Sequence, residues 1–294
     1  MSIEDTIKAY VQLAETAFSK TRWWWQEGRY EGALLERAIN IIVSENVHST
    51  SQIRESIAIT KRERDDKNME RGKQMMMEDP HPPEHQCPVF VCAAPIGGEI
   101  PVTHLRTYHV PGKETPNYAI WQAARATCSV PYLFKPATIT CDGLTTRYMD
   151  NSLKCNNPTR SLLHEAAALF PGRSVSCIIS IGTGHIKVRE PRLTKPPRLL
   201  CARLPMIVHA ISKDREHVHE ILYSSLYRSK IYYRFNLGQA LSGMGPEEWK
   251  MTRGVKDRLV HYEGDRSVHA DIYWATEAII TRPALIKIEE ALWS

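Results

Sequence analysis

The apolar run Val175–Ile181 (V-S-C-I-I-S-I) is the feature that most constrains the fold of this chain. A short run of this kind is typical of a strand that is buried on both faces. Other expected strands lie at residues 89–94, 104–110, 147–149 and 231–237. Because helical patterns separate these short strands, the sequence predicts an α/β fold with a mostly parallel sheet.

Helical spacing of apolar residues predicts the intervening helices. In the first, at residues 2–18, Ser2 can cap a helix whose first turn carries Glu4 and Asp5. The other expected helices lie at residues 32–47, 118–126, 158–170, 206–228, 267–280 and 283–293. Residues 191–205 are proline-rich and basic, so we expect a loop there.

Composition narrows the class of protein. The chain has 294 residues, 43% of them hydrophobic, and a net charge of +5. This mild basicity permits attraction to anionic membrane surfaces and does not require a nucleic-acid partner. Seven cysteines without a C-x-x-C pair indicate a reducing compartment. The acidic N-terminus does not resemble a secretory signal, and no apolar run has the length of a membrane span. We therefore expect a cytoplasmic protein that can lie peripherally on membranes.

Two local features have more than one interpretation. The triplet Trp23–Trp25 could anchor the chain at a membrane interface, although packing of a loop onto the core is the simpler interpretation. Residues 60–85 are charged and apolar-poor, so we expect a solvated helix or mobile insertion within a single domain that spans residues 1–294. His81, His85 and Cys87 lie close together in sequence, but no fourth ligand at a suitable spacing supports a metal site.

Two strand ends are candidate positions for chemistry, because functional groups of α/β sheets gather there. Asp150 follows the strand at 147–149 and could act as an acid, a base or an orienting carboxylate. It could equally serve only to order its loop. Gly182-Thr183-Gly184 permits a tight turn after the second strand, but it lacks the pattern of a phosphate-binding loop.

The chain contains no G-x-S-x-G sequence, which would mark a serine nucleophile at a strand–turn–helix junction. The nearest pieces are Gly172–Ser176, which precedes a strand, and Ser242–Gly245, which lacks the first glycine. The remaining candidate bases are His185, His217 and His219. Nothing in the sequence pairs these histidines with a nucleophile, and exposed or hydrogen-bonded histidines are the simpler interpretation.

Several segments are collinear with motifs of one protein family. The matching segments are A-R-A-T-C-S-V-P at 124–131 within Ala119–Pro136, Y-M-D-N-S-L-K-C-N-N-P at 148–158, S-I-G-T-G at 180–184, C-P-V-F-V-C-A at 87–93 and L-R-T-Y at 105–108. Together they resemble the patatin-like phospholipases, especially the fungal members. The resemblance implies a three-layer α/β sandwich that hydrolyses phospholipids or other lipid esters at a membrane surface.

The resemblance also implies a mechanism. Family members use a Ser–Asp dyad, in which the aspartate takes the hydroxyl proton of the serine without a histidine. Backbone N–H groups of a glycine-rich turn stabilise the oxyanion. Asp150 corresponds to the dyad aspartate. The mechanism requires neither calcium nor another cofactor.

The sequence departs from the family pattern in three places. The nucleophile has no counterpart, and residues 2–18 resemble the segment that follows the nucleophile elbow. We therefore expect an N-terminally truncated domain that lacks its first strands, its oxyanion turn and its elbow. Asn151-Ser152 replaces two small residues, where glycines would allow close backbone approach. Cys128 replaces a serine that is not the nucleophile.

Three hypotheses follow for this sequence. The first is that it is a fragment of a complete patatin-like hydrolase. The second is that it is a truncated pseudoenzyme that binds lipid surfaces or proteins, as the tryptophan triplet and the basic excess suggest. The third is that it is a residual enzyme that uses Cys128 or Ser152 as its nucleophile. Under the family mechanism, we expect the chain as given to be inactive, because the nucleophile and the oxyanion hole are both missing. Longer forms could carry fused modules or bind a protein partner.

Overall fold

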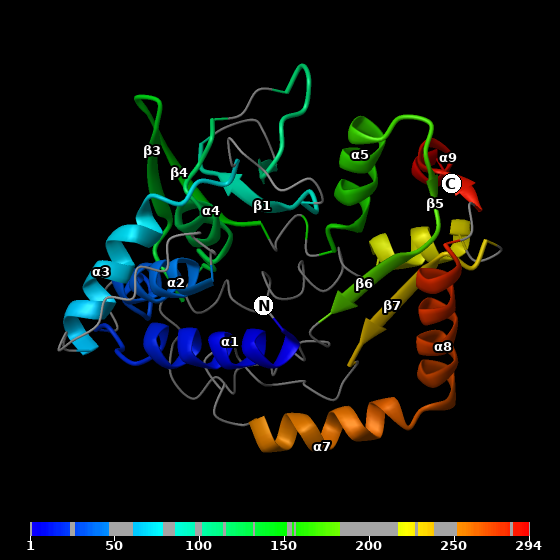
Figure 1. Cartoon of the computed structure of the whole chain (residues 1–294), viewed down its shortest axis with the longest axis horizontal. Helices are drawn as coiled ribbons and strands as arrows, with labels where there is room; N and C mark the ends of the chain where they lie inside the picture. Colours follow the sequence, from blue (N-terminus) through cyan, green and yellow to red (C-terminus); the bar gives the residue numbers. More distant parts are fainter. Residues whose placement is uncertain are drawn as a thin grey trace, which may run out of the picture. The chain divides into compact units, whose positions relative to one another are not determined.

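The computed structural model in Figure 1 divides into two compact units, Met1–Asn151 and Ser152–Ser294. It describes residues 2–23, 27–46, 61–78, 86–97, 102–113, 116–131, 133–151, 155, 157–182, 217–226, 229–237, 252–282 and 285–293. That the chain forms a single domain over residues 1–294 stays a prediction.

An antiparallel sheet positions the chemistry of the first unit. Its strands are β1 (Phe90–Pro95), β2 (Thr103–Arg106), β3 (Ala137–Cys141) and β4 (Leu144–Asp150), in the order β2-β1-β4-β3. β1 pairs with β2 through Val91 and Leu105, and it pairs with β4 through Ala93 and Asp150. Asp150 therefore lies beside a central strand of this sheet.

The prediction of a mostly parallel sheet is wrong for the four-stranded sheet of the first unit. Every pairing in this four-stranded sheet is antiparallel. Connection length accounts for two of these three pairings, because a parallel pair needs a crossover of about a dozen residues or more. Only residues 96–102 join β1 to β2, and the two-residue turn Asp142-Gly143 joins β3 to β4 with φ values of 49° and 78°. Asp-Gly between alternating segments is a local hairpin signal, although β3 was not among the expected strands.

Four helices accompany this sheet in the described part of the first unit: α1 (Ile3–Ala17), α2 (Gly32–Asn46), α3 (Lys61–Lys73) and α4 (Ile120–Thr127). The helix predicted at residues 2–18 is confirmed, and the Ser2 hydroxyl accepts a hydrogen bond from the Asp5 N–H as its N-terminal cap. Burial is confined to its second half, because Ala14 and Ala17 are buried while Ile3 and Ile7 remain exposed.

The charged segment after residue 60 forms the helix α3, which packs against α2. Gly72 lies directly against the carbonyl oxygen of Asn40, so that a side chain at this position would collide with the α2 backbone. An ion pair of 3.1 Å between Arg37 and Asp66 adds a contact between the two helices. The described part of this segment is thus a packed helix rather than a mobile insertion.

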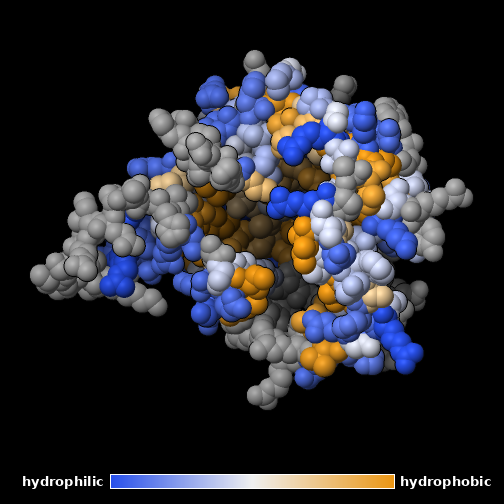
Figure 2. Space-filling view, turned by 45° about the vertical axis from the view of Figure 1, so that its right-hand side comes forward, coloured by the Kyte–Doolittle hydropathy of each residue, from blue (hydrophilic) through white to orange (hydrophobic). Residues whose placement is uncertain are grey.

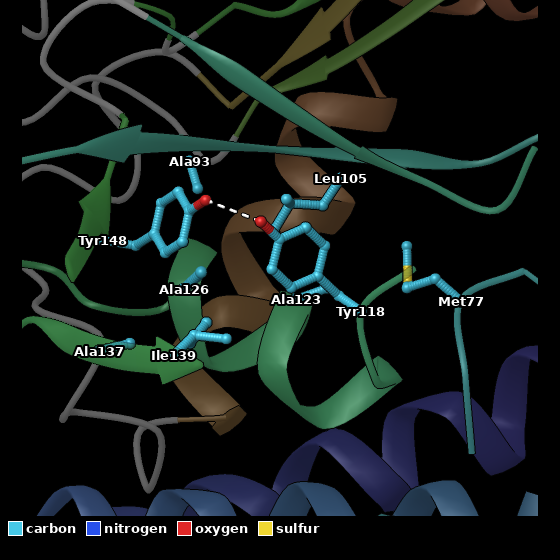
Figure 3. Packing of buried hydrophobic residues seen from close by; sticks show 9 residues of the cluster. All are labelled: Met77, Ala93, Leu105, Tyr118, Ala123, Ala126, Ala137, Ile139 and Tyr148. Atoms are coloured by element: carbon cyan, nitrogen blue, oxygen red, sulfur yellow. Dashed lines mark hydrogen bonds between the residues drawn. The ribbon is translucent and has the colours of Figure 1, made fainter. Parts of the chain in front are cut away.

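The hydrophobic core of the first unit joins the four strands to α4 (Figure 3). Ala93, Leu105 and Ile139 of the sheet pack with Ala123 and Ala126 of α4. The side chains of Tyr118 and Tyr148 point toward each other in this core, and their buried hydroxyl groups share a hydrogen bond of 3.0 Å (Figure 3).

The second unit contains two small sheets in its described residues. In one, β6 (Ile178–Gly182) runs parallel to β7 (Tyr232–Asn236); in the other, β5 (Ser174–Val175) pairs antiparallel with β8 (Ile286–Lys287). The single strand expected at 175–181 is therefore divided between two sheets. The described helices are α5 (Thr159–Leu169), residues 217–226, α7 (Thr252–Glu263), α8 (Arg266–Thr281) and α9 (Ile288–Trp293).

Leu163, Ile178, Leu222, Leu226 and Ile231 form the core of the second unit. They join α5, the helix at 217–226 and the parallel strands. The helix expected at 283–293 is shorter than predicted, because residues 286–287 pair as β8 before α9 begins. We did not predict α7, whose sequence is mainly polar.

The surface carries hydrophobic residues scattered among hydrophilic ones on the face shown in Figure 2. Trp23 is 66% exposed, so packing onto the core does not hold for this residue, and Trp24 and Trp25 lie outside the described residues. Among the described helices, none combines the length and apolar character needed to cross a bilayer.

Candidate active site

Asp150 is the last residue of β4, as the sequence predicted for a strand that runs into this aspartate. Its backbone N–H donates a hydrogen bond of 3.0 Å to the carbonyl oxygen of Ser129. On the other side, Asp150 stands opposite Ala93 of β1. The backbone of the candidate base is thus held between a sheet strand and the loop that follows α4.

Arg125 ties this loop to the rest of the first unit. Its side chain is only 4% exposed, and its Nη1 donates a 2.6 Å hydrogen bond to the Ser129 hydroxyl. Nη2 donates to the carbonyl oxygen of Lys135 at 2.9 Å, and Nε forms an ion pair with Glu36 of α2 at 3.2 Å. Burial lowers the pKa of Arg125, while the Glu36 carboxylate opposes that shift. The arginine of the A-R-A-T motif therefore joins α2, α4 and the loop that supports Asp150.

Thr127 and Cys128 of the same motif lie at the C-terminal end of α4. The Thr127 hydroxyl donates a hydrogen bond of 2.9 Å to the carbonyl oxygen of Cys92 in β1. Burial raises the pKa of the Cys128 thiol, and the negative charge of Asp150 raises it further. Since the thiolate is the nucleophilic form of cysteine, this environment disfavours Cys128 as a nucleophile.

Asn151 occupies the position where the family pattern has a glycine. Its side chain is 1% exposed, and neither its amide nitrogen nor its amide oxygen has a hydrogen-bond partner among the described residues. Asn151 is absent from the described non-glycine residues with positive φ. The substitution therefore imposes no left-handed backbone, but it buries an amide next to the candidate base. Ser152 lies outside the described residues.

Two further motifs meet within the second unit. The Ser180 hydroxyl of S-I-G-T-G donates a hydrogen bond of 3.3 Å to Oδ1 of Asn157 in N-N-P. The same oxygen accepts a bond of 2.6 Å from the Thr159 hydroxyl at the start of α5. A Cβ atom at Gly182 would lie 2.7 Å from the side-chain oxygen of Asn236, so a larger residue there would displace that side chain. These residues connect β6, β7 and α5.

The other predicted candidates do not assemble into a second site within the described residues. His219 shares a 3.3 Å hydrogen bond with the Tyr232 hydroxyl, which agrees with its simpler interpretation. Cys87 is exposed, and the described ranges contain no group of three residues that could hold a metal ion. His81, His85, the turn residues 183–184, His185 and Ser242–Gly245 lie outside those ranges.

The roles of Arg125 and Thr127 went unrecognised in the sequence, although both stand in a motif that we quoted. Their position before Asp150 in the chain does not indicate how close they lie to it in the fold. The antiparallel pairing of β1 with β4 brings them to the same end of the sheet. The resulting arrangement offers one carboxylate that could accept a proton, supported by a buried polar network.

The described fold is α/β, and a carboxylate at a strand end marks its candidate site. Residues 4–163 match the model of the patatin-like phospholipases. The chain therefore belongs to the patatin-like phospholipase family.

Several curated proteins are similar to this chain. Calcium-independent phospholipase A2-gamma of Mus musculus is 30% identical over 174 residues, which cover 56% of this chain and 21% of that protein. The Homo sapiens protein of the same name is 32% identical over 119 residues, 40% of this chain and 14% of its own length. Phospholipase A I of Arabidopsis thaliana is 32% identical over 72 residues, 24% of this chain and 5% of its own length. The matched residues thus span about a fifth of the first of these relatives.

Proposed function

We propose that this chain is part of a lipid acyl hydrolase of the phospholipase A type, in which Asp150 is the general base of a Ser–Asp dyad. The observation that carries the proposal is the support of Asp150 by Ser129, which Arg125 in turn holds. Family membership and the phospholipase relatives support a phospholipid or another lipid ester as substrate.

In the proposed reaction, the Asp150 carboxylate takes the proton of a serine hydroxyl while that oxygen attacks the acyl carbon. Backbone N–H groups stabilise the oxyanion that forms. Because the 294 residues contain no G-x-S-x-G, we propose that they do not complete this mechanism alone. The proposed complete domain is of the fungal type, a three-layer sandwich whose nucleophile elbow precedes the present residues.

The name of the mammalian relatives supports a reaction that requires no calcium. A location in the cytoplasm, peripheral on a membrane, belongs to the same proposal. A module that binds lipid surfaces or proteins without catalysis is the second candidate, and the exposed Trp23 together with the net charge of +5 favours it.

The deciding experiment begins with the N-terminus of the endogenous protein, mapped by intact mass and terminal peptides. The protein is then treated with a fluorophosphonate probe and assayed with phosphatidylcholine vesicles in the presence of a calcium chelator. We expect a product that contains G-x-S-x-G, labels with the probe and hydrolyses the lipid. Asp150→Asn should abolish hydrolysis.

Asp142→Asn is the matched control, because Asp142 is an exposed carboxylate on the β3–β4 turn of the same sheet. It should retain full activity. If the Asp150→Asn variant retains full activity, as the Asp142→Asn variant should, then Asp150 is not the general base. A folded endogenous protein that starts at Met1, does not label and binds anionic vesicles would favour the second candidate.

A further inference from the structure

The second unit contains a cavity of about 410 Å³ that its own residues line. The helix at 217–226, β7 and α8 contribute to this lining, through residues that include His219, Tyr232, Trp274, Lys230, Arg234 and Asp271. The volume falls within the usual range of small-ligand sites, about 300–1,000 Å³. Aromatic rings and two cationic side chains therefore face one space of ligand size.

Lys230 combines an unusual backbone with a charge that no described carboxylate neutralises. It is one of the described non-glycine residues with positive φ, at 50°, and the Tyr233 hydroxyl fixes its carbonyl oxygen through a 2.7 Å hydrogen bond. Its ammonium lies 5.6 Å from the ring centre of Trp274. A strained conformation held by neighbouring groups is a feature of ligand sites. Within the described residues, no carboxylate forms an ion pair with Lys230.

Arg234 brings a second cation to the same cavity. Its Nη1 donates a 2.6 Å hydrogen bond to the neutral Ser180 hydroxyl, while its Nε is buried without a partner among the described residues. No described carboxylate forms an ion pair with this guanidinium. The guanidinium lines the cavity without a described carboxylate partner, so this side of the cavity favours an anionic acceptor.

Asp271 is the acidic residue in the described lining, and it forms no described ion pair with Lys230 or Arg234. Burial raises the pKa of its carboxyl, and no described cation opposes that shift. The exposed ring of Trp274 lies one helical turn further along α8 and offers a flat apolar wall. The cavity therefore combines an excess of positive charge with an aromatic face.

We propose that this cavity binds an amphipathic anion, whose phosphate or carboxylate oxygens contact Lys230 and Arg234 and whose apolar body lies against Trp274. Such an anion could come from a phosphate-bearing lipid or from a free fatty acid. The inference does not depend on the proposed hydrolysis, because binding is measurable in a protein without any esterase activity.

The test is calorimetric titration of the full 294-residue protein with decyl phosphate and decanoate below their micelle concentrations. Decanol and inorganic phosphate serve as ligands that lack the charge or the chain. We expect saturable binding of at least one amphipathic anion, and at least tenfold weaker binding of decanol and of inorganic phosphate. Tighter binding of decyl phosphate would indicate a phosphate-bearing lipid, and tighter binding of decanoate a fatty acid; either supports the proposal.

Lys230→Gln should raise the dissociation constant by about tenfold or more, which is typical for the loss of a charge-assisted hydrogen bond. Lys287→Gln is the matched control, because it makes the same change of charge on β8, outside the cavity lining, and should stay within about twofold. Asp271→Asn should strengthen binding, and it keeps the test decisive if Lys230→Gln fails to fold. Decanol binding as tight as that of the anions would overturn the proposal, as would equal affinities of the two lysine variants.

Discussion

Arg125 and Ser129 lie one helical turn apart and are joined twice. The Arg125 Nη1 donates to the Ser129 hydroxyl at 2.6 Å, and that hydroxyl donates to the Arg125 carbonyl oxygen at 2.8 Å. The Ser129 carbonyl oxygen then accepts the backbone N–H of Asp150. A buried cation therefore supports the backbone of the candidate base through the intervening serine.

Arg125→Ala should destabilise the protein by about 1–3 kcal/mol, because the buried Ser129 hydroxyl and the Lys135 carbonyl oxygen lose their donor, whereas the Glu36 carboxylate is 41% exposed to water. Urea denaturation followed by circular dichroism measures the free energy of unfolding. Arg147→Ala removes an exposed arginine of β4 and should change stability by about 0.5 kcal/mol or less. Equal losses of stability in the two variants would show that the hydrogen bonds of Arg125 contribute no more to the free energy of unfolding than an exposed arginine does.

Tyr118 should make the stability depend on alkaline pH. Burial and the Tyr148 hydroxyl raise the pKa of Tyr118 in the folded protein. The folded state therefore retains its proton while the unfolded chain ionises near its usual value of about 10. The contribution of the protonated Tyr118 hydroxyl to the free energy of unfolding is fully present below about pH 10 and is lost as the pH rises further.

Denaturation of the wild type and of Tyr118→Phe at several pH values from about 8 to about 11 measures this effect. The wild type should lose stability more steeply above about pH 10 than the variant does. Tyr10→Phe, at an exposed position of α1, should keep the wild-type slope. If the stability of Tyr118→Phe falls with pH as steeply as that of the wild type, Tyr118 is not the source of this pH dependence.

Cys128 should react slowly with thiol reagents, because its raised pKa leaves little thiolate near neutral pH. Iodoacetamide labelling near neutral pH, mapped by mass spectrometry, should modify the exposed Cys87 first. Asp150→Asn removes a charge that disfavours the thiolate, so the labelling rate of Cys128 should rise. An unchanged rate would mean that the carboxylate does not act on the thiol.

Gly72→Ala tests the packing of the charged helix. In an exposed helix, replacing glycine by alanine stabilises the fold by about 0.5–1 kcal/mol. At Gly72 we expect destabilisation by about 1–3 kcal/mol instead, because the new methyl group meets the Asn40 carbonyl. Gly264→Ala has only ordinary contacts and should change thermal stability little. A stabilised Gly72→Ala variant would show that α3 does not pack closely on α2.

Local sequence predicted most of the described helices and strands, because the signals for these elements are local. Ser2 caps α1 as expected, and the predicted helix at 158–170 corresponds to α5. The strand before Asp150 was likewise predicted from a few adjacent residues. The resemblance to patatin-like phospholipases identified the family correctly because its motifs are collinear from about residue 87 to residue 184.

The sequence by itself therefore determined the α/β character, the family and the position of Asp150 at a strand end. Only the tertiary structure decided which strands are neighbours, because pairing and direction depend on connection length and on contacts between distant residues. It placed the Thr127 hydroxyl against the Cys92 carbonyl of β1, made Ser129 the acceptor for Asp150 and brought Lys230, Arg234 and Trp274 to one cavity. These contacts cannot be predicted from local sequence patterns, because the burial of a side chain and the electrostatic field around it depend on residues far away in the chain.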